Sequence, residues 1–283
     1  MHILKGKILQ LKSINNLEYI EISNKAATAK IALQGAHIFH YQRVGEEPLL
    51  WLSETSEFEK GKAIRGGVPI CWPSFGNNNP DLPQHGFARV MMWQCDGVVE
   101  IDDHTTQVAF SLQDSKESHL LWDYKFAVNL FVTVGKTLHL ELQTTNLDTK
   151  PFTITQALHT YFKISSIEDV AIKGLEGKRY FDALTLKDEI QEGSIAFNRE
   201  VDRVYQGVEN TITLKDSKHE VHIQNSGSKS VVVWNPWIQK CARMSAMQAD
   251  AYKEFVCIES ANAYEDKREV LPKEVHTLKV DLK

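Results

Sequence analysis

His159 is the residue whose type and setting best suit proton transfer. Polar and apolar residues alternate along 155–162 (TQALHTYF), so an extended strand would place His159 on a small and polar face. The opposite face would be apolar, with Ile154, Leu158 and Phe162. Histidine exchanges a proton near neutral pH, as a general acid must. A structural histidine satisfied by a neighbour is the alternative interpretation.

Glu259 has the setting of a general base. It ends the apolar run 255–258 and is followed by small and polar residues. A carboxylate directly after a buried strand is partly desolvated, which raises its pKa and makes it a better base. The alternative is a strand-end charge that faces water.

A segment that fits no regular element spans residues 64–89 and reads IRGGVPICWPSFGNNNPDLPQHGFAR. It holds four prolines, four glycines and the turn-forming asparagines at 77–79. A long loop in a compact domain is usually functional or disordered. Trp72, Phe75 and Phe87 favour order, because burying aromatic rings offsets the entropy of fixing the loop.

Four residues of this loop suit the recognition of a small anion. Arg65 and Arg89 bracket it, and Gln84 and His85 lie near its end. A guanidinium presents a planar fork that matches phosphate or carboxylate oxygens, so two of them on one loop can clamp a dianion. Two solvated surface arginines are the alternative.

The elements that must position these residues are predicted to be strands. Period-two alternation is unbroken over 138–143 (LHLELQ), and Gly135-Lys136 forms a hairpin turn after the run 126–134. Similar segments predict further strands at 29–33, 108–112, 152–164, 212–214, 221–224, 231–234, 255–259 and 276–282. Only 49–60 and 242–252 have helical patterns, and both are short. We expect an all-β fold of packed antiparallel sheets, with residues 1–283 as a single domain.

Composition narrows the range of functions. The chain has 283 residues, 42% of them hydrophobic and 24% charged, which is typical of a globular protein with a large core. The formal net charge is -5 with no basic block, which argues against nucleic acid or an anionic membrane as a partner. Neither a membrane-length apolar run nor a leader pattern at 1–16 is present, so we expect a cytoplasmic protein.

The sequence carries no pattern typical of a cofactor or metal site. Glycine-rich dinucleotide and P-loop motifs are missing, and the four cysteines, which form no C-x-x-C pair, are expected to be reduced core thiols. His37 and His40, like His219 and His222, are three apart in predicted strands, where they point to opposite faces. We therefore expect no metal and no cofactor.

Six segments in chain order resemble the aldose 1-epimerase superfamily, and specifically its hexose-6-phosphate mutarotase (glucose-6-phosphate 1-epimerase) branch. They are 64–73 (IRGGVPICWP), 84–89 (QHGFAR), 157–162 (ALHTYF), 201–205 (VDRVY), 233–237 (VWNPW) and 257–262 (CIESAN). One departure is Ser260, where many relatives have proline, and it puts the local backbone in question.

The resemblance implies a galactose-mutarotase-like β-super-sandwich of large antiparallel sheets with a few short helices. It implies that His159 is the general acid and Glu259 the general base of anomer interconversion. It also implies that the substrate, a sugar phosphate, is contacted by Arg65, Gln84, Arg89 and Asp202, to which we add His85. An ion pair of Asp202 with Arg203 is the alternative for that carboxylate, and a monomer is expected.

Other functions remain open on the same scaffold. An epimerase of unphosphorylated aldoses and a non-catalytic sugar-phosphate-binding protein are both compatible with the fold. A glycoside hydrolase requires two carboxylates flanking the bond, so one histidine with one carboxylate fits ring opening better.

Overall fold

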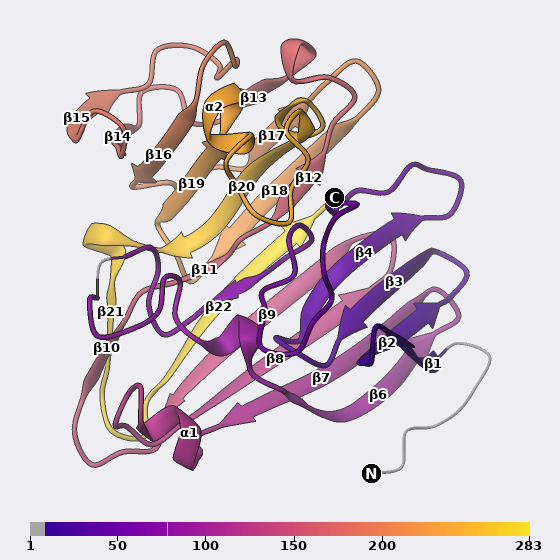
Figure 1. Ribbon diagram of the computed structural model, residues 1–283, viewed down its shortest axis with the longest axis vertical. Helices are drawn as coiled ribbons and strands as arrows, with labels where there is room; N and C mark the ends of the chain where they lie inside the picture. Colours follow the sequence, from indigo (N-terminus) through magenta and orange to yellow (C-terminus); the bar gives the residue numbers. More distant parts are fainter. Residues whose placement is uncertain (1–8, 78) are drawn as a thin grey trace.

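The computed structural model describes residues 9–77 and 79–283 and consists mainly of antiparallel strands (Figure 1). The expected leader-free segment 1–16 and the asparagine turn at 77–79 lie partly outside the described residues. The prediction of an all-β fold with few short helices is confirmed. A single domain over residues 1–283 remains a prediction.

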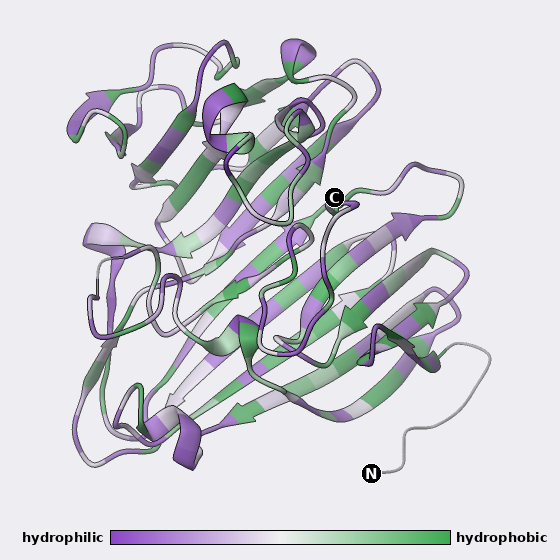
Figure 2. Cartoon of the chain, viewed as in Figure 1, coloured by the Kyte–Doolittle hydropathy of each residue, from purple (hydrophilic) through white to green (hydrophobic). Residues whose placement is uncertain are grey.

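The longest strands form an eight-stranded sheet, here called the backing sheet. Its strand order is β13 (Ala171–Lys173), β17 (Ile212–Lys215), β18 (Glu220–Ser226), β22 (Val275–Leu282), β9 (Leu138–Asn146), β8 (Phe126–Val134), β7 (Thr105–Gln113) and β6 (Gln94–Asp102). Along β8 and β9 buried and half-buried residues alternate without a break, as the sequence predicts. Figure 2 shows the same alternation as green and purple bands along the long strands.

A second eight-stranded sheet, here called the site sheet, carries the candidate chemistry. Its order is β15 (Lys187–Ile190), β14 (Arg179–Asp182), β16 (Val201–Gln206), β19 (Ser230–Asn235), β20 (Phe255–Asn262), β11 (Gln156–Leu158) and β5 (Ile70–Cys71), and β12 (Tyr161–Lys163) also pairs with β20. A four-stranded sheet consists of β1 (Leu9–Ile14), β2 (Leu17–Ser23), β3 (Ala27–Ala32) and β4 (His37–Arg43), and β10 (Phe152–Ile154) pairs with β21 (Arg268–Val270).

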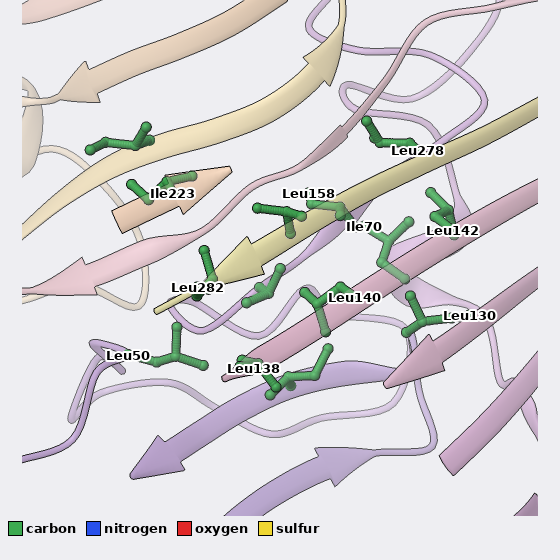
Figure 3. Close-up of a cluster of buried hydrophobic side chains, with 14 of the residues drawn as sticks. Leu50, Ile70, Leu130, Leu138, Leu140, Leu142, Leu158, Ile223, Leu278 and Leu282 are labelled. Carbon is green, nitrogen blue, oxygen red and sulfur yellow. The ribbon is translucent and has the colours of Figure 1, made fainter. Parts of the chain in front are cut away.

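The core lies between the two large sheets. Leu138, Leu140 and Leu142 of the backing sheet belong to the same buried cluster as Ile70 and Leu158 of the site sheet (Figure 3). The exposed fraction of each of these five side chains is 0%. Because fully buried leucines contribute about 1.5–3 kcal/mol each, this layer holds the site sheet rigidly in place.

The helices of the described residues are short: α1 (Lys116–His119) and α2 (Trp237–Cys241), with 3-10 turns at η1 (Ala88–Val90), η2 (Ile167–Asp169), η3 (Ala251–Lys253) and η4 (Tyr264–Asp266). The helices predicted at 49–60 and 242–252 are both wrong. Residues 49–60 instead form two isolated bridges, Leu50 opposite Phe162 and Leu52 opposite Gly66, followed by turns and irregular backbone. Residues 242–250 are turns between α2 and η3. Bridges to distant segments replace the helical ladder in the first place, and short turn hydrogen bonds replace it in the second.

The predicted strand 152–164 is broken into β10, β11 and β12. The breaks fall where the backbone pairs with loop 64–89: the Thr155 amide donates to the Pro73 carbonyl and the His159 amide to the Pro69 carbonyl, both at 3.0 Å. Trp72, Phe75 and Phe87 of that loop are buried, as expected for an ordered segment.

The four cysteines are free and buried, which confirms the expectation of core thiols. In the part of the chain that the structure describes, no helix has both the length and the apolar character needed to span a bilayer.

Candidate active site

All seven residues singled out from the sequence line one cavity of about 400 Å³. They are Arg65, Gln84, His85, Arg89, His159, Asp202 and Glu259. The cavity lies over the site sheet, where α2 and the loop after it (orange in Figure 1) pass in front of β19 and β20. The fold therefore brings together side chains from residue 65 to residue 259.

Strand register brings His159 and Glu259 together. Leu158 of β11 pairs with Ser260 of β20, and Tyr161 of β12 pairs with Cys257, so the register continues across the break between β11 and β12. His159 therefore stands opposite Glu259, and directly opposite residues in an antiparallel pair have Cβ atoms about 4.5–5.5 Å apart. Its Nε2 lies 3.2 Å from Glu259 Oε1.

The strand that carries Glu259 is regular through Ser260. Ser260 pairs with both Leu158 and Val231, and its hydroxyl donates to Asn225 Oδ1 at 2.6 Å. Serine in place of the expected proline thus keeps the ladder of β20 intact, and the carboxylate keeps its position.

Burial shifts the two members of the pair in opposite directions. The exposed fractions of His159 and Glu259 are 8% and 1%. Burial, followed by the proximity of His85 and the charge of Arg89, holds the pKa of His159 well below its usual value. Burial, followed by the charge of Asp202, raises the pKa of Glu259 well above its usual value. These opposite shifts leave one proton for the pair, and at 3.2 Å the two groups titrate as a coupled unit.

Aromatic rings fix the plane of the imidazole. The Tyr161 ring stacks on His159 with centroids 4.9 Å apart and planes 16° apart, and the Trp234 ring meets it edge-on at 6.0 Å. His159 Nδ1 and Glu259 Oε2 are buried with no hydrogen-bond partner among the described residues. Buried polar atoms without a hydrogen-bond partner are rare in folded proteins, so these two atoms are candidates for contacts with a substrate.

His85 enters the cavity from a strained turn. It has φ 63° and is followed by Gly86 at φ 68°, where a Cβ would overlap the Trp72 carbonyl oxygen. Its Nδ1 accepts a hydrogen bond from the Gly76 amide at 3.3 Å, so the proton of the neutral ring is on Nε2. Burial, followed by the charges of Arg89 and Arg65, lowers the pKa of His85 to about 3. The ring is thus a neutral donor at physiological pH.

The two arginines of the loop have no carboxylate partner within residues 9–77 and 79–283. Arg89 Nη2 donates to the Gln84 carbonyl at 2.7 Å, and Arg65 Nε is buried without a partner. By contrast, Arg268 contacts Asp266 at 2.6 Å. Two guanidinium groups with unused donors in one cavity have the chemistry to bind an anion.

Asp202 is paired with a residue that the sequence did not single out. Its Oδ2 lies 3.5 Å from Lys240 Nζ, and Lys240 also lies 2.9 Å from Glu200. The expected alternative partner, Arg203, approaches Asp182 at 3.8 Å instead. Burial is the main cause that raises the pKa of Asp202. Neighbours on a strand point to opposite faces, so residues 202 and 203 do not meet.

Ten further residues line the cavity that the sequence analysis left out of the site, among them Tyr161, Trp234, Lys240, Met244 and Ser245. Trp234 is buried and also lines the cavity. Lys240, Met244 and Ser245 come from α2 and the following turns, where no local pattern marks them. These three residues reach the cavity only because their segment folds back over the site sheet.

No group of three or more histidine, cysteine, aspartate or glutamate side chains in the described part of the chain is arranged to hold a metal ion. His37 lies buried under the loop, with Nε2 2.8 Å from the Gly66 carbonyl oxygen, and His219 lies 3.3 Å from Asp216. These histidines therefore contact the backbone or a carboxylate.

Comparisons with known proteins agree on one family. The model of the family described as aldose 1-epimerase matches residues 18–283. Two curated bacterial proteins named "Putative glucose-6-phosphate 1-epimerase" are similar: the one from Salmonella typhimurium is 36% identical, covering 90% of this chain and 87% of the relative. The one from Escherichia coli is 34% identical, covering 95% and 91%.

Solved structures agree with this relationship. The crystal structure of a "putative mutarotase (YeaD)" from Salmonella typhimurium superposes with a TM-score of 0.92 at 32% identity, over 99% of this chain and 95% of that one. A "galactose mutarotase-like protein" from Lactobacillus casei has a TM-score of 0.76 at 16% identity, over 94% and 99% of the two chains, which shows a shared fold. The expected galactose-mutarotase-like sandwich is confirmed.

Proposed function

Because this chain belongs to the aldose 1-epimerase family and is an isomerase that interconverts sugar anomers, we propose that its substrate is a hexose 6-phosphate, specifically glucose 6-phosphate. The proposal includes the roles of His159 and Glu259 as the acid-base pair. The observation that carries it is that the guanidinium groups of Arg65 and Arg89 line the cavity without a carboxylate partner among the described residues.

Anomer interconversion needs two proton transfers and one bond rotation. A proton leaves the anomeric hydroxyl while another reaches the ring oxygen, and the hemiacetal opens to the aldehyde. Rotation about the bond between C1 and C2 presents the other carbonyl face, and reclosure gives the opposite anomer. No atom is gained or lost, so one acid and one base suffice.

Glu259 removes the hydroxyl proton and protonated His159 supplies the proton to the ring oxygen. On reclosure the roles reverse, which returns both groups to their starting states. The short contact between Nε2 and Oε1 supports this assignment, because it places both groups within reach of one hemiacetal. Positioned acid-base groups contribute about 10²–10⁴ each in rate.

The remaining site residues orient the sugar. Neutral His85 donates through Nε2, Gln84 and Asp202 bind hydroxyl groups, and Arg65 with Arg89 holds the phosphate. A charge-assisted hydrogen bond contributes about 1.5–3 kcal/mol, which is about tenfold to a hundredfold in affinity. Phosphate recognition thus accounts for selectivity over the neutral sugar.

The test compares fresh α-glucose and α-glucose 6-phosphate by polarimetry or exchange NMR. We expect a much higher kcat/KM for the phosphorylated sugar. Arg89→Ala should reduce it about tenfold to a hundredfold with little effect on glucose. Arg179→Ala is the matched control, because this arginine pairs with Glu265 and Asp188 outside the cavity. Equal loss for both sugars, or equal use of both by the unchanged enzyme, would refute the phosphate role and favour an aldose epimerase.

A further inference from the structure

Positive charge surrounds the proposed acid. Arg65 and Arg89 line the same cavity as His159, and the His85 ring lies 5.6 Å from the His159 ring. No described carboxylate neutralises either guanidinium, and His159 Nδ1, which carries the other ring proton when Nε2 is protonated, has no hydrogen-bond partner among the described residues. The positive charges in the cavity therefore disfavour the protonated imidazole that ring opening requires.

The two members of the pair respond differently to these cations. After burial and His85, the charges of Arg89 and Arg65 act to lower the pKa of His159. The carboxyl of Glu259 is governed by burial and by Asp202 instead. With the anion site free, the shared proton therefore resides on Glu259, opposite a neutral His159. In that state Glu259 already carries a proton and cannot act as the base, and neutral His159 cannot act as the acid.

We propose that a dianion held by Arg65 and Arg89 activates the acid-base pair, so that free phosphite or phosphate accelerates the anomerisation of aldoses that carry no phosphate group. The inference rests on the proposed function, because it assigns a second task to the same anion site. The phosphate is then an activator of the chemistry as well as an anchor.

Charge balance supports this second task. Two guanidinium charges are cancelled by one dianion, which removes the repulsion that opposes a proton on His159. The other groups facing the imidazole are the neutral rings of His85, Tyr161 and Trp234, and Glu259 itself. Asp202 acts on Glu259 from β16.

The activating step moves one proton over a short distance. The proton leaves the Glu259 carboxyl and binds His159 Nε2 across the 3.2 Å contact, which gives a carboxylate and an imidazolium. No proton is exchanged with solvent, and no bond to the sugar changes. The pair is then in the state that accepts the anomeric proton and protonates the ring oxygen.

The experiment uses α-xylose, an aldopentose that lacks the sixth carbon and so leaves the anion site free. Anomerisation is followed by polarimetry with increasing phosphite dianion at constant ionic strength. We expect at least about a tenfold rise in kcat/KM, which corresponds to one unit in the proton affinity of the acid. The alkaline limb of the kcat profile should move to higher pH, because the dianion opposes loss of the shared proton.

Two variants locate the effect. Arg89→Ala should abolish the phosphite activation, whereas Arg179→Ala, on the outer surface, should leave the activation and the basal rate unchanged. Equal activation in Arg89→Ala and the unchanged enzyme would overturn the inference, because the anion would then act elsewhere.

The same preparation is assayed with glucose 6-phosphate and glucose, which separates the two proposals. A strong preference for the phosphorylated sugar without phosphite activation of xylose would overturn the inference and leave the proposed function standing. Equal use of glucose 6-phosphate and glucose would overturn the proposed function itself. Inhibition by phosphite would show that the bound anion competes with the substrate and does not activate the acid-base pair. That result would also overturn the inference.

Discussion

Replacing Glu259 by glutamine should slow the enzyme and stabilise its fold. The exposed fraction of Glu259 is 1%, and its Oε2 has no hydrogen-bond partner among the described residues. Burial raises the pKa of this carboxyl well above 4.5, so ionising it opposes folding. An amide is neutral at every pH and is similar enough in shape to keep the contact with His159 Nε2.

The magnitude follows from the raised pKa. Each unit by which the folded pKa exceeds the unfolded pKa costs the fold about 1.4 kcal/mol at a pH above both values. We therefore expect Glu259→Gln to raise the free energy of unfolding at pH 8 by about 1–3 kcal/mol and Tm by a few degrees. At the same time kcat should fall about 10²–10⁴ because the base is lost.

The pH dependence has a definite sign. Since the folded pKa lies above the unfolded one, the cost of ionisation is absent below the unfolded pKa, grows as pH rises above it, and is complete above the folded pKa. The increase in the free energy of unfolding caused by Glu259→Gln should thus be largest at high pH and vanish near pH 4.

Urea unfolding from pH 4 to pH 8 measures the effect, with Glu141→Gln as the matched control. Partial burial acts to raise the pKa of Glu141, but hydrogen bonds from Lys279 and Gln143 lower it, so this variant should gain no stability. A Glu259→Gln protein that is less stable at pH 8, or that keeps its turnover, would refute the reasoning.

Three further expectations concern the acid, a buried aspartate and the loop. His159→Asn should lower kcat about 10²–10⁴ with an unchanged circular dichroism spectrum, and near-normal turnover would exclude it as the acid. Burial acts to raise the pKa of Asp216, but the amides of Ser165 and Lys218 hold it at about 2. Its stabilisation, about 1–2 kcal/mol above pH 4, is lost as pH falls from 4 to 2, and urea unfolding of Asp216→Asn should lack this loss. Gly86→Ala should cost at least about 2 kcal/mol in thermal unfolding, since its Cβ would overlap the Trp72 carbonyl, and an unchanged Tm would contradict that geometry.

Local pattern determined the strands and the faces of the long ones. Side chains alternate with period two in any extended chain, so the leucines at 138, 140 and 142 predict a buried face without reference to the rest of the fold. The six motif segments made the family recognisable, and the family model spans residues 18–283. Both kinds of information are present along the chain itself.

Tertiary structure decided which of these residues meet. His159 and Glu259 are a hundred residues apart, and only the register of β11 and β12 on β20 sets them opposite each other. Residues 49–60 form bridges to distant segments in place of the predicted helix, because local propensity is weak against tertiary pairing, and residues 242–252 form turns that include η3. Lys240 reaches the cavity because its segment folds over the site sheet, and nothing in its neighbours along the chain predicts that contact.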